Sequence, residues 1–124
     1  MADIEDNAAS LRSSRDDALA TLQVAIDRVE HELATTNEVG PYLKRLADRD
    51  DALVNEAAAV REATTEAVLA LPAVEQAAAT LVNLAQQMQK VAKRLPTATD
   101  VLTTSAAALS LGQRFVDVII AAQK

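Results

Sequence analysis

The sequence predicts an all-α protein, an antiparallel four-helix bundle with a single helical domain over residues 1–124. Between Leu43 and Leu95, apolar residues recur in alternating steps of three and four, which keeps them on one stripe of a helix, as in a coiled-coil seam. With 2 Gly and 3 Pro, the chain has too few turn residues for a β-sandwich or a Rossmann sheet. The seam, apolar except at Asp50 and Thr64, consists of Leu43, Leu46, Asp50, Leu53, Ala57, Val60, Thr64, Ala67, Leu71, Val74, Ala78, Leu81, Ala85, Met88, Ala92 and Leu95.

The first helix is predicted over about residues 10–38, where five apolar residues continue the same spacing. Gly40 and Pro41 end this helix, since glycine suits the left-handed residue after a helix and proline cannot continue one. A second helix is predicted over residues 42–71. The apolar stripe of the first helix is Leu19, Leu22, Ile26, Val29 and Leu33.

Pro72 separates the second helix from a third, predicted over residues 72–94. Proline inside a helix costs about 3 kcal/mol, whereas it is favourable as the first residue of a new helix. The seam nevertheless keeps its phase from Leu71 to Val74, and no Gly, Asn, Asp or Ser lies beside Pro72 to form a tight reversal. The alternative is an elongated bundle in which one long helix, from Tyr42 to Leu95, is kinked at Pro72.

The fourth helix is predicted over residues 98–123, after Thr97 and Asp100, whose spacing is that of a variant capping box. Its apolar side chains after residue 114 spread over about 200° at 100° per residue, wider than the stripe of an ordinary surface helix. Two small residues four apart also predict a close helix crossing. This helix is therefore either the central helix of the bundle or, in addition, a subunit interface. The predicted interaction residues are Ala108, Gly112, Phe115, Val116, Ile119 and Ile120.

The charge of the chain is unevenly distributed around a net value of −6. Residues 1–71 carry 15 acids and 7 bases, whereas residues 72–124 carry 3 acids and 5 bases. The acidic first half disfavours binding to nucleic acid. The sparse charge of the second half indicates that something besides solvent covers part of it, which predicts a homo-oligomer, a dimer or larger, or a protein partner.

The sequence contains little of the chemistry that an enzyme needs. It has no cysteine, which excludes disulfides, thiolate metal ligands and cysteine nucleophiles. His31 is the single histidine, and its position relative to the apolar stripe turns it toward solvent. Gly40 and Gly112 stand alone, so no phosphate-binding loop is present. We therefore expect no catalytic residues, no bound metal and no cofactor.

The segment His31-Glu32-Leu33-Ala34-Thr35 resembles the start of the phospho-accepting box of sensor histidine kinases. The resemblance covers five residues and implies that His31 is a phosphoacceptor. Ala34 stands where that box has a basic residue, and Thr36 stands where it has proline.

Association is the predicted function: a non-enzymatic helical module that binds through its charge-poor second half. One alternative is an amphiphilic coat on lipid or another hydrophobic surface, of the kind that phasin-like proteins provide. The other alternative is histidine phosphotransfer through His31. The acidic start, residues 1–6, lacks the features of a signal peptide, and the uncharged stretches are shorter than the roughly 18 residues of a membrane span, so we expect a cytoplasmic location.

Overall fold

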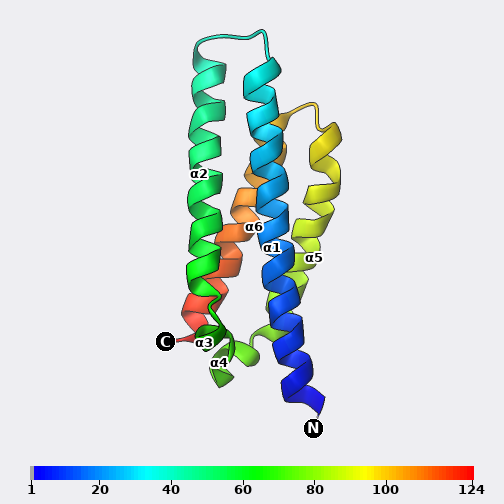
Figure 1. Ribbon diagram of the computed structural model, residues 1–124, viewed down its shortest axis with the longest axis vertical. Helices are drawn as coiled ribbons and strands as arrows, with labels where there is room; N and C mark the ends of the chain where they lie inside the picture. The colour runs from blue at the N-terminus through cyan, green and yellow to red at the C-terminus, as the bar shows by residue number, and fades with distance from the viewer. Residues whose placement is uncertain (1) are drawn as a thin grey trace.

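The computed structural model describes the backbone of residues 2–124 and the side chains of residues 7–124. The predicted all-α class is confirmed, since every regular element in this range is helical. Four long helices form a bundle in which each runs opposite to the long helix before it (Figure 1). The acidic residues 1–6, on which the signal-peptide prediction rests, have side chains outside the described residues. The long helices are α1 (Ala2–Thr35), α2 (Pro41–Ala63), α5 (Ala78–Arg94) and α6 (Val101–Ala122).

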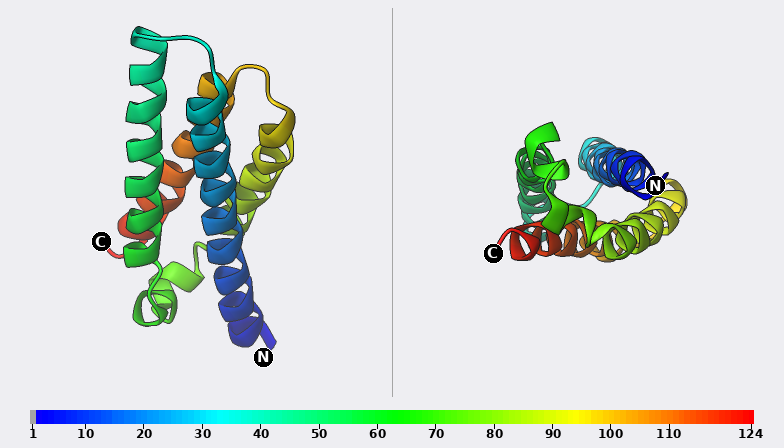
Figure 2. Two further views of the ribbon diagram at one scale, coloured as in Figure 1. Left: turned by 45° about the horizontal axis from the view of Figure 1, so that its top comes forward. Right: turned by 90° about the horizontal axis from the view of Figure 1, so that it is seen from below.

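The α6 helix passes obliquely behind α1, from the end of α5 at one end of the bundle to the end of α2 at the other (Figures 1 and 2). The predicted close crossing is confirmed at Gly112. A Cβ atom there would lie 3.1 Å from Cγ of Glu56 on α2 and 3.4 Å from Cδ2 of Leu22 on α1. The missing side chain of Gly112 therefore lets three helices meet.

The predicted stripes supply most of the core. Leu22, Ile26 and Val29 of α1 are buried, while Leu19 and Leu33 are half-buried at the margins. The core extends beyond the predicted stripe toward the amino terminus. The small residues at positions 14, 18, 21 and 25 are buried, and they allow α1 to contact three helices. The seam residues that the bundle buries are Leu46, Leu53, Ala57, Val60, Thr64, Val74, Ala78, Leu81, Ala85, Met88 and Leu95.

The predicted bounds around Pro72 are wrong. The chain leaves α2 at Ala63, forms two single turns, α3 (Glu66–Leu69) and α4 (Pro72–Glu75), and enters α5 at Ala78. Thr65 begins α3 by accepting a hydrogen bond from the Val68 backbone N–H. Pro72 is the first residue of α4, as proline at a helix start should be. The single kinked helix is thus replaced by a reversal spread over residues 64–77, which explains why the seam residues Ala67 and Leu71 are exposed.

The other predicted bounds also differ from the structure. The α1 helix begins at Ala2 instead of residue 10 and ends at Thr35 instead of residue 38. Gly40, at φ 72°, precedes α2 instead of directly following α1. A short 3₁₀ turn, η1 (Leu95–Thr97), then follows α5. Asp100, not Thr97, caps α6, and its Oδ1 accepts a hydrogen bond of 3.0 Å from the Thr103 backbone N–H. This bond and a second from the Thr103 hydroxyl lower the pKa of Asp100.

Candidate functional site

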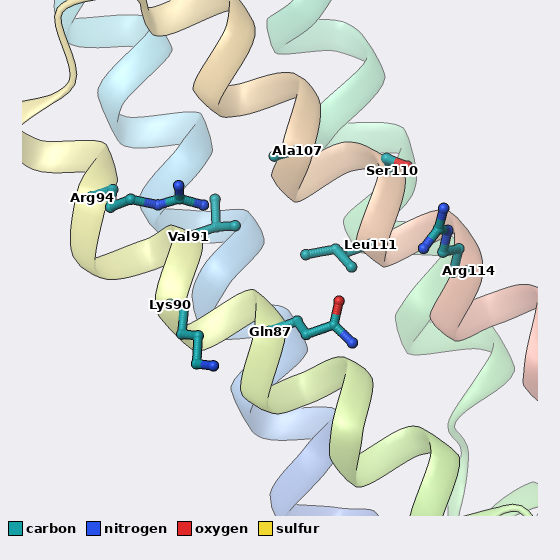
Figure 3. A pocket seen from close by; sticks show the side chains of 8 residues that line it. All are labelled: Gln87, Lys90, Val91, Arg94, Ala107, Ser110, Leu111 and Arg114. Atoms are coloured by element: carbon teal, nitrogen blue, oxygen red, sulfur yellow. The ribbon is translucent and has the colours of Figure 1, made fainter.

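The α5 and α6 helices border an open groove of about 360 Å³ on the surface of the bundle. Each helix contributes four residues with the same spacing of three, one and three, so the groove follows two turns of each helix, about 10 Å. Figure 3 shows Leu111 pointing from α6 toward α5, with Val91 on the facing helix. The lining residues are Gln87, Lys90, Val91, Arg94, Ala107, Ser110, Leu111 and Arg114, and they form what is called here the α5/α6 groove.

Three exposed cations border the α5/α6 groove, and none of its described lining residues is acidic. Lys90 and Arg94 stand one turn apart on α5, and Arg114 lies on α6, on the far side of Leu111 from them (Figure 3). Within the described part of the chain, none of the three forms an ion pair with a carboxylate. The groove therefore concentrates unneutralised positive charge on a protein whose net charge is −6.

The arginines of α1 are arranged differently, because each has a carboxylate partner. Arg28 lies 3.6 Å from Glu32 and also donates hydrogen bonds to the carbonyls of Leu95 and Ala98 beyond α5. Arg12 and Arg15 both contact Glu66 of α3, and these bonds lower the pKa of the Glu66 carboxyl. The contrast sets the α5/α6 groove apart from the cations that hold the bundle together.

The bundle itself buries most of the predicted interaction residues. Ala108, Phe115 and Ile119 are at most 1% exposed, and Gly112 is buried at the crossing with α1 and α2. Val116 is half-buried and Ile120 is 45% exposed, so these two remain at the surface. Packing within one chain therefore accounts for four of the six predicted interaction residues and leaves Val116 and Ile120 outside the core.

The exposed face of α5 is polar despite its few charges. Its first turn exposes Ala79 and Thr80, amide side chains follow in its middle turns, and cations occupy its last two turns. The large exposed apolar residues of the described chain lie on different elements and are Val39, Val54, Leu71 and Ile120. On α5 the few charges before residue 90 are therefore replaced by amides and small side chains. The exposed amides of α5 are Asn83, Gln86, Gln87 and Gln89.

His31 is exposed on α1, as its place outside the apolar stripe predicts. It borders a shallow hollow of about 290 Å³ with Asp27, Arg28 and Pro96. Among the described residues, no group of three or more histidine, aspartate and glutamate side chains is arranged to hold a metal ion. The hollow places a cation and a carboxylate near the imidazole but no second histidine.

Two carboxyl groups lie in unfavourable surroundings between helices. Asp50, the polar residue of the seam, is half-buried, and its Oδ1 has no hydrogen-bond partner. Its negative charge raises the pKa of Glu30 on α1. Glu56 beside Gly112 has a buried Oε2 without a partner, and burial, together with the charge of Asp117, raises its pKa. Burial of the ionised Glu56 carboxylate therefore opposes helix packing.

Two polar side chains of α2, Tyr42 and Arg49, form hydrogen bonds to other helices. The Tyr42 hydroxyl donates to Glu32 at 2.8 Å, which raises the pKa of Tyr42 to about 12. Arg49 of α2 donates to the Leu102 carbonyl and, at 2.9 Å, to the Ser105 hydroxyl of α6. The hydrogen bonds of Arg49 could not be predicted from the sequence, because their partners lie more than fifty residues away. For Tyr42, the acid ten residues earlier across the predicted turn was the available signal.

The α6 helix has the length and mean hydropathy of a membrane-crossing helix, and 28% of the tested window is buried in the bundle. The expectation of no membrane span rests on uncharged stretches, whereas α6 has this composition with Arg114 and Asp117 included. The same test is passed by core helices of soluble proteins.

Comparison with protein-family models, curated proteins and solved structures finds no match for this chain.

Proposed function

We propose that this chain is a non-enzymatic helical module that binds a protein, a second copy of itself or another chain, through the face formed by α5 and α6. The α5/α6 groove carries the proposal, because three cations without an ion-pair partner in the described chain gather on a lining that has no acidic residue. Protein interfaces have a polar rim around a more apolar centre, and complementary charges across them favour association. A cytoplasmic location and an oligomer of two or more copies belong to the same proposal.

The amides of α5 support this choice of face. An amide donates and accepts hydrogen bonds, and it loses less free energy than a charged group when a partner excludes water. Gln87 lies in the groove, and Gln86 and Gln89 continue the amide surface toward α1. A polar protein interface therefore fits this face better than a purely apolar one.

Site-specific photo-crosslinking in cells tests the proposal. A photoreactive amino acid is introduced at Gln87 or Ser110 in the groove, and at the exposed positions Asp51 or Asn55 of α2 as matched controls. We expect discrete crosslinked products from the two groove positions only. Equal products from α2, or none from α5 and α6, would contradict the proposed binding face.

A coat on a hydrophobic surface is the second candidate, and the hydropathy of α6 favours it. In that function α6 would turn its apolar residues from the core toward lipid, which requires the bundle to open. Flotation with liposomes and with oil droplets tests this candidate. It predicts flotation together with loss of the tertiary packing around Phe115, and a protein that stays in the aqueous phase with its bundle intact would exclude it.

A further inference from the structure

The α5/α6 groove has the shape that a third helix fills. Two adjacent antiparallel helices present a furrow between their side-chain ridges, and a ridge of another helix packs into such a furrow. Its floor contains Val91 and the half-buried Ala107 and Leu111. The groove extends over two turns of both helices, a length that matches apolar side chains at i, i+3 or i+4, and i+7 of an incoming helix.

The cations at the rims of the groove indicate which residues should flank the apolar stripe of the incoming helix. Lys90 and Arg94 are four residues apart, so their side chains follow one line along α5. Carboxylates one turn apart on an incoming helix would face both. Arg114 on the opposite wall would meet an acid on the other flank of the same helix. Ser110 and Gln87 add hydrogen-bonding groups between these charges.

We propose that the α5/α6 groove binds an acidic amphipathic helix of a different protein, with an apolar stripe over Leu111 and acidic residues on both flanks. This inference rests on the proposed function and names the chemistry of the partner. The occupant is acidic because every charged residue that lines the groove is a cation. Its binding weakens with salt, since exposed ion pairs are screened.

Fluorescence anisotropy with a designed peptide tests the proposal. The probe is a labelled helical peptide with leucine at i, i+3 and i+7 and glutamate on both flanks, and its matched control carries lysine in place of each glutamate. We expect the intact protein to bind the glutamate peptide, and to bind the lysine peptide at least about tenfold more weakly. Equal binding of both peptides, or no binding of the glutamate peptide, would overturn the proposal.

Charge reversal in the protein locates the contact. Arg94→Glu and Arg114→Glu should each weaken binding at least about tenfold, and both side chains are exposed, so the fold should persist in circular dichroism. Lys93→Glu is the control, since Lys93 is exposed on the same helix, changes the net charge equally and lies outside the groove. An equal loss of peptide affinity in Lys93→Glu would show that the effect comes from the net charge of the protein, and it would overturn the proposal.

Other occupants give distinguishable outcomes. Binding to anionic phospholipid vesicles in place of the peptide would overturn the helix proposal in favour of a membrane surface. Self-association of the wild type that Arg94→Glu abolishes would identify a second copy as the occupant and overturn the proposal of a different protein. Failure of the peptide to bind, with crosslinks from Gln87 and Ser110 retained, would refute the acidic helix and leave the proposed function standing.

Discussion

Glu56 shows how a single residue limits the packing of the bundle. Its carboxyl is placed beside Gly112, where α1, α2 and α6 meet, and its buried Oε2 has no hydrogen-bond partner. Water solvates the ionised form better than this site does, so burial raises the pKa of Glu56 above its ordinary 4.5. A Cβ atom added at position 112 would compete with the Glu56 side chain for the same space.

We expect Glu56→Gln to be more stable than the wild type at neutral pH. A carboxyl whose pKa is raised by folding stabilises the folded state below its ordinary pKa, and this contribution is lost as the pH rises through the folded-state pKa. The difference between the proteins should therefore shrink below pH 4.5, the ordinary pKa of this carboxyl. Urea denaturation at several pH values measures this difference in the free energy of unfolding.

Glu62→Gln is the control for the Glu56 experiment, because Glu62 is exposed on the same helix. It should leave the pH dependence of the free energy of unfolding unchanged. A Glu56→Gln variant that follows the wild type at every pH would show that the ionised carboxyl reaches solvent.

His31→Ala should change the free energy of unfolding by less than about 0.5 kcal/mol, as at an ordinary exposed site. We also expect no phosphoryl group on His31 when the protein is incubated with a phosphorylated response regulator. Ala34 and Thr36 depart from the phospho-accepting box at two positions. An acid-labile, base-stable phosphoryl group on the wild type that is lost in His31→Ala would establish phosphotransfer instead.

The α6 helix has one buried stripe, and the rest of its surface is half-buried or exposed. Phe115→Ala should lower the free energy of unfolding by about 3–5 kcal/mol, since it removes a side chain that is 1% exposed. Ile120→Ala, with a side chain that is 45% exposed, should change it by about 0.5 kcal/mol or less. Chemical denaturation measures both. A fully stable Phe115→Ala variant that has lost only self-association would restore the interpretation of Phe115 as an interface residue.

The reversal between α2 and α5 shows how weakly a proline locates a helix end. Pro72 begins a single turn, while α2 ends nine residues before it at Ala63. The available signal was Thr64-Thr65, since threonine bonds back to the preceding helical turn and also caps a new one. Threonine is not among glycine, asparagine, aspartate and serine, the residues expected at a tight reversal, although it forms this one.

At the scale of the whole molecule, spin labels distinguish the bundle from a continuous kinked helix. Lys44 is exposed in the first turn of α2, and Lys93 is exposed in the last turn of α5. These two helix ends lie at the same end of the bundle, since α2 and α5 run in opposite directions (Figure 1). The two helices are separated by α1 and α6, against which both pack, and with packed axes about 8–10 Å apart the labels should lie within about 40 Å of each other. A continuous helix would separate them by about 74 Å at 1.5 Å per residue.

Double electron–electron resonance on labelled protein diluted with unlabelled protein makes the measurement independent of oligomeric state. A distance distribution centred near 70 Å would contradict the reversal at residues 64–77. A labelled pair at Lys44 and Asn55, both exposed on α2, is the control and should give about 17 Å between backbones, the rise over eleven residues.

The sequence by itself determined the class of the fold and most of its core. Periodicity is a local property, so the phase of residues such as Leu53, Leu81 and Met88 identified buried side chains without knowledge of their neighbours. It likewise identified the close crossing at Gly112 and the exposure of His31, because both follow from the position of a residue around its own helix.

The gathering of the three cations around one groove depends on how α5 and α6 pack. Lys90 and Arg94 belong to one helix and Arg114 to another, and no local pattern relates residues twenty positions apart across a turn. The oblique course of α6 brings these helices together and at the same time turns Phe115 and Ile119 into the core. Whether an apolar residue faces its own bundle or a partner depends on this three-dimensional arrangement, which is why the predicted interaction residues and the observed groove differ.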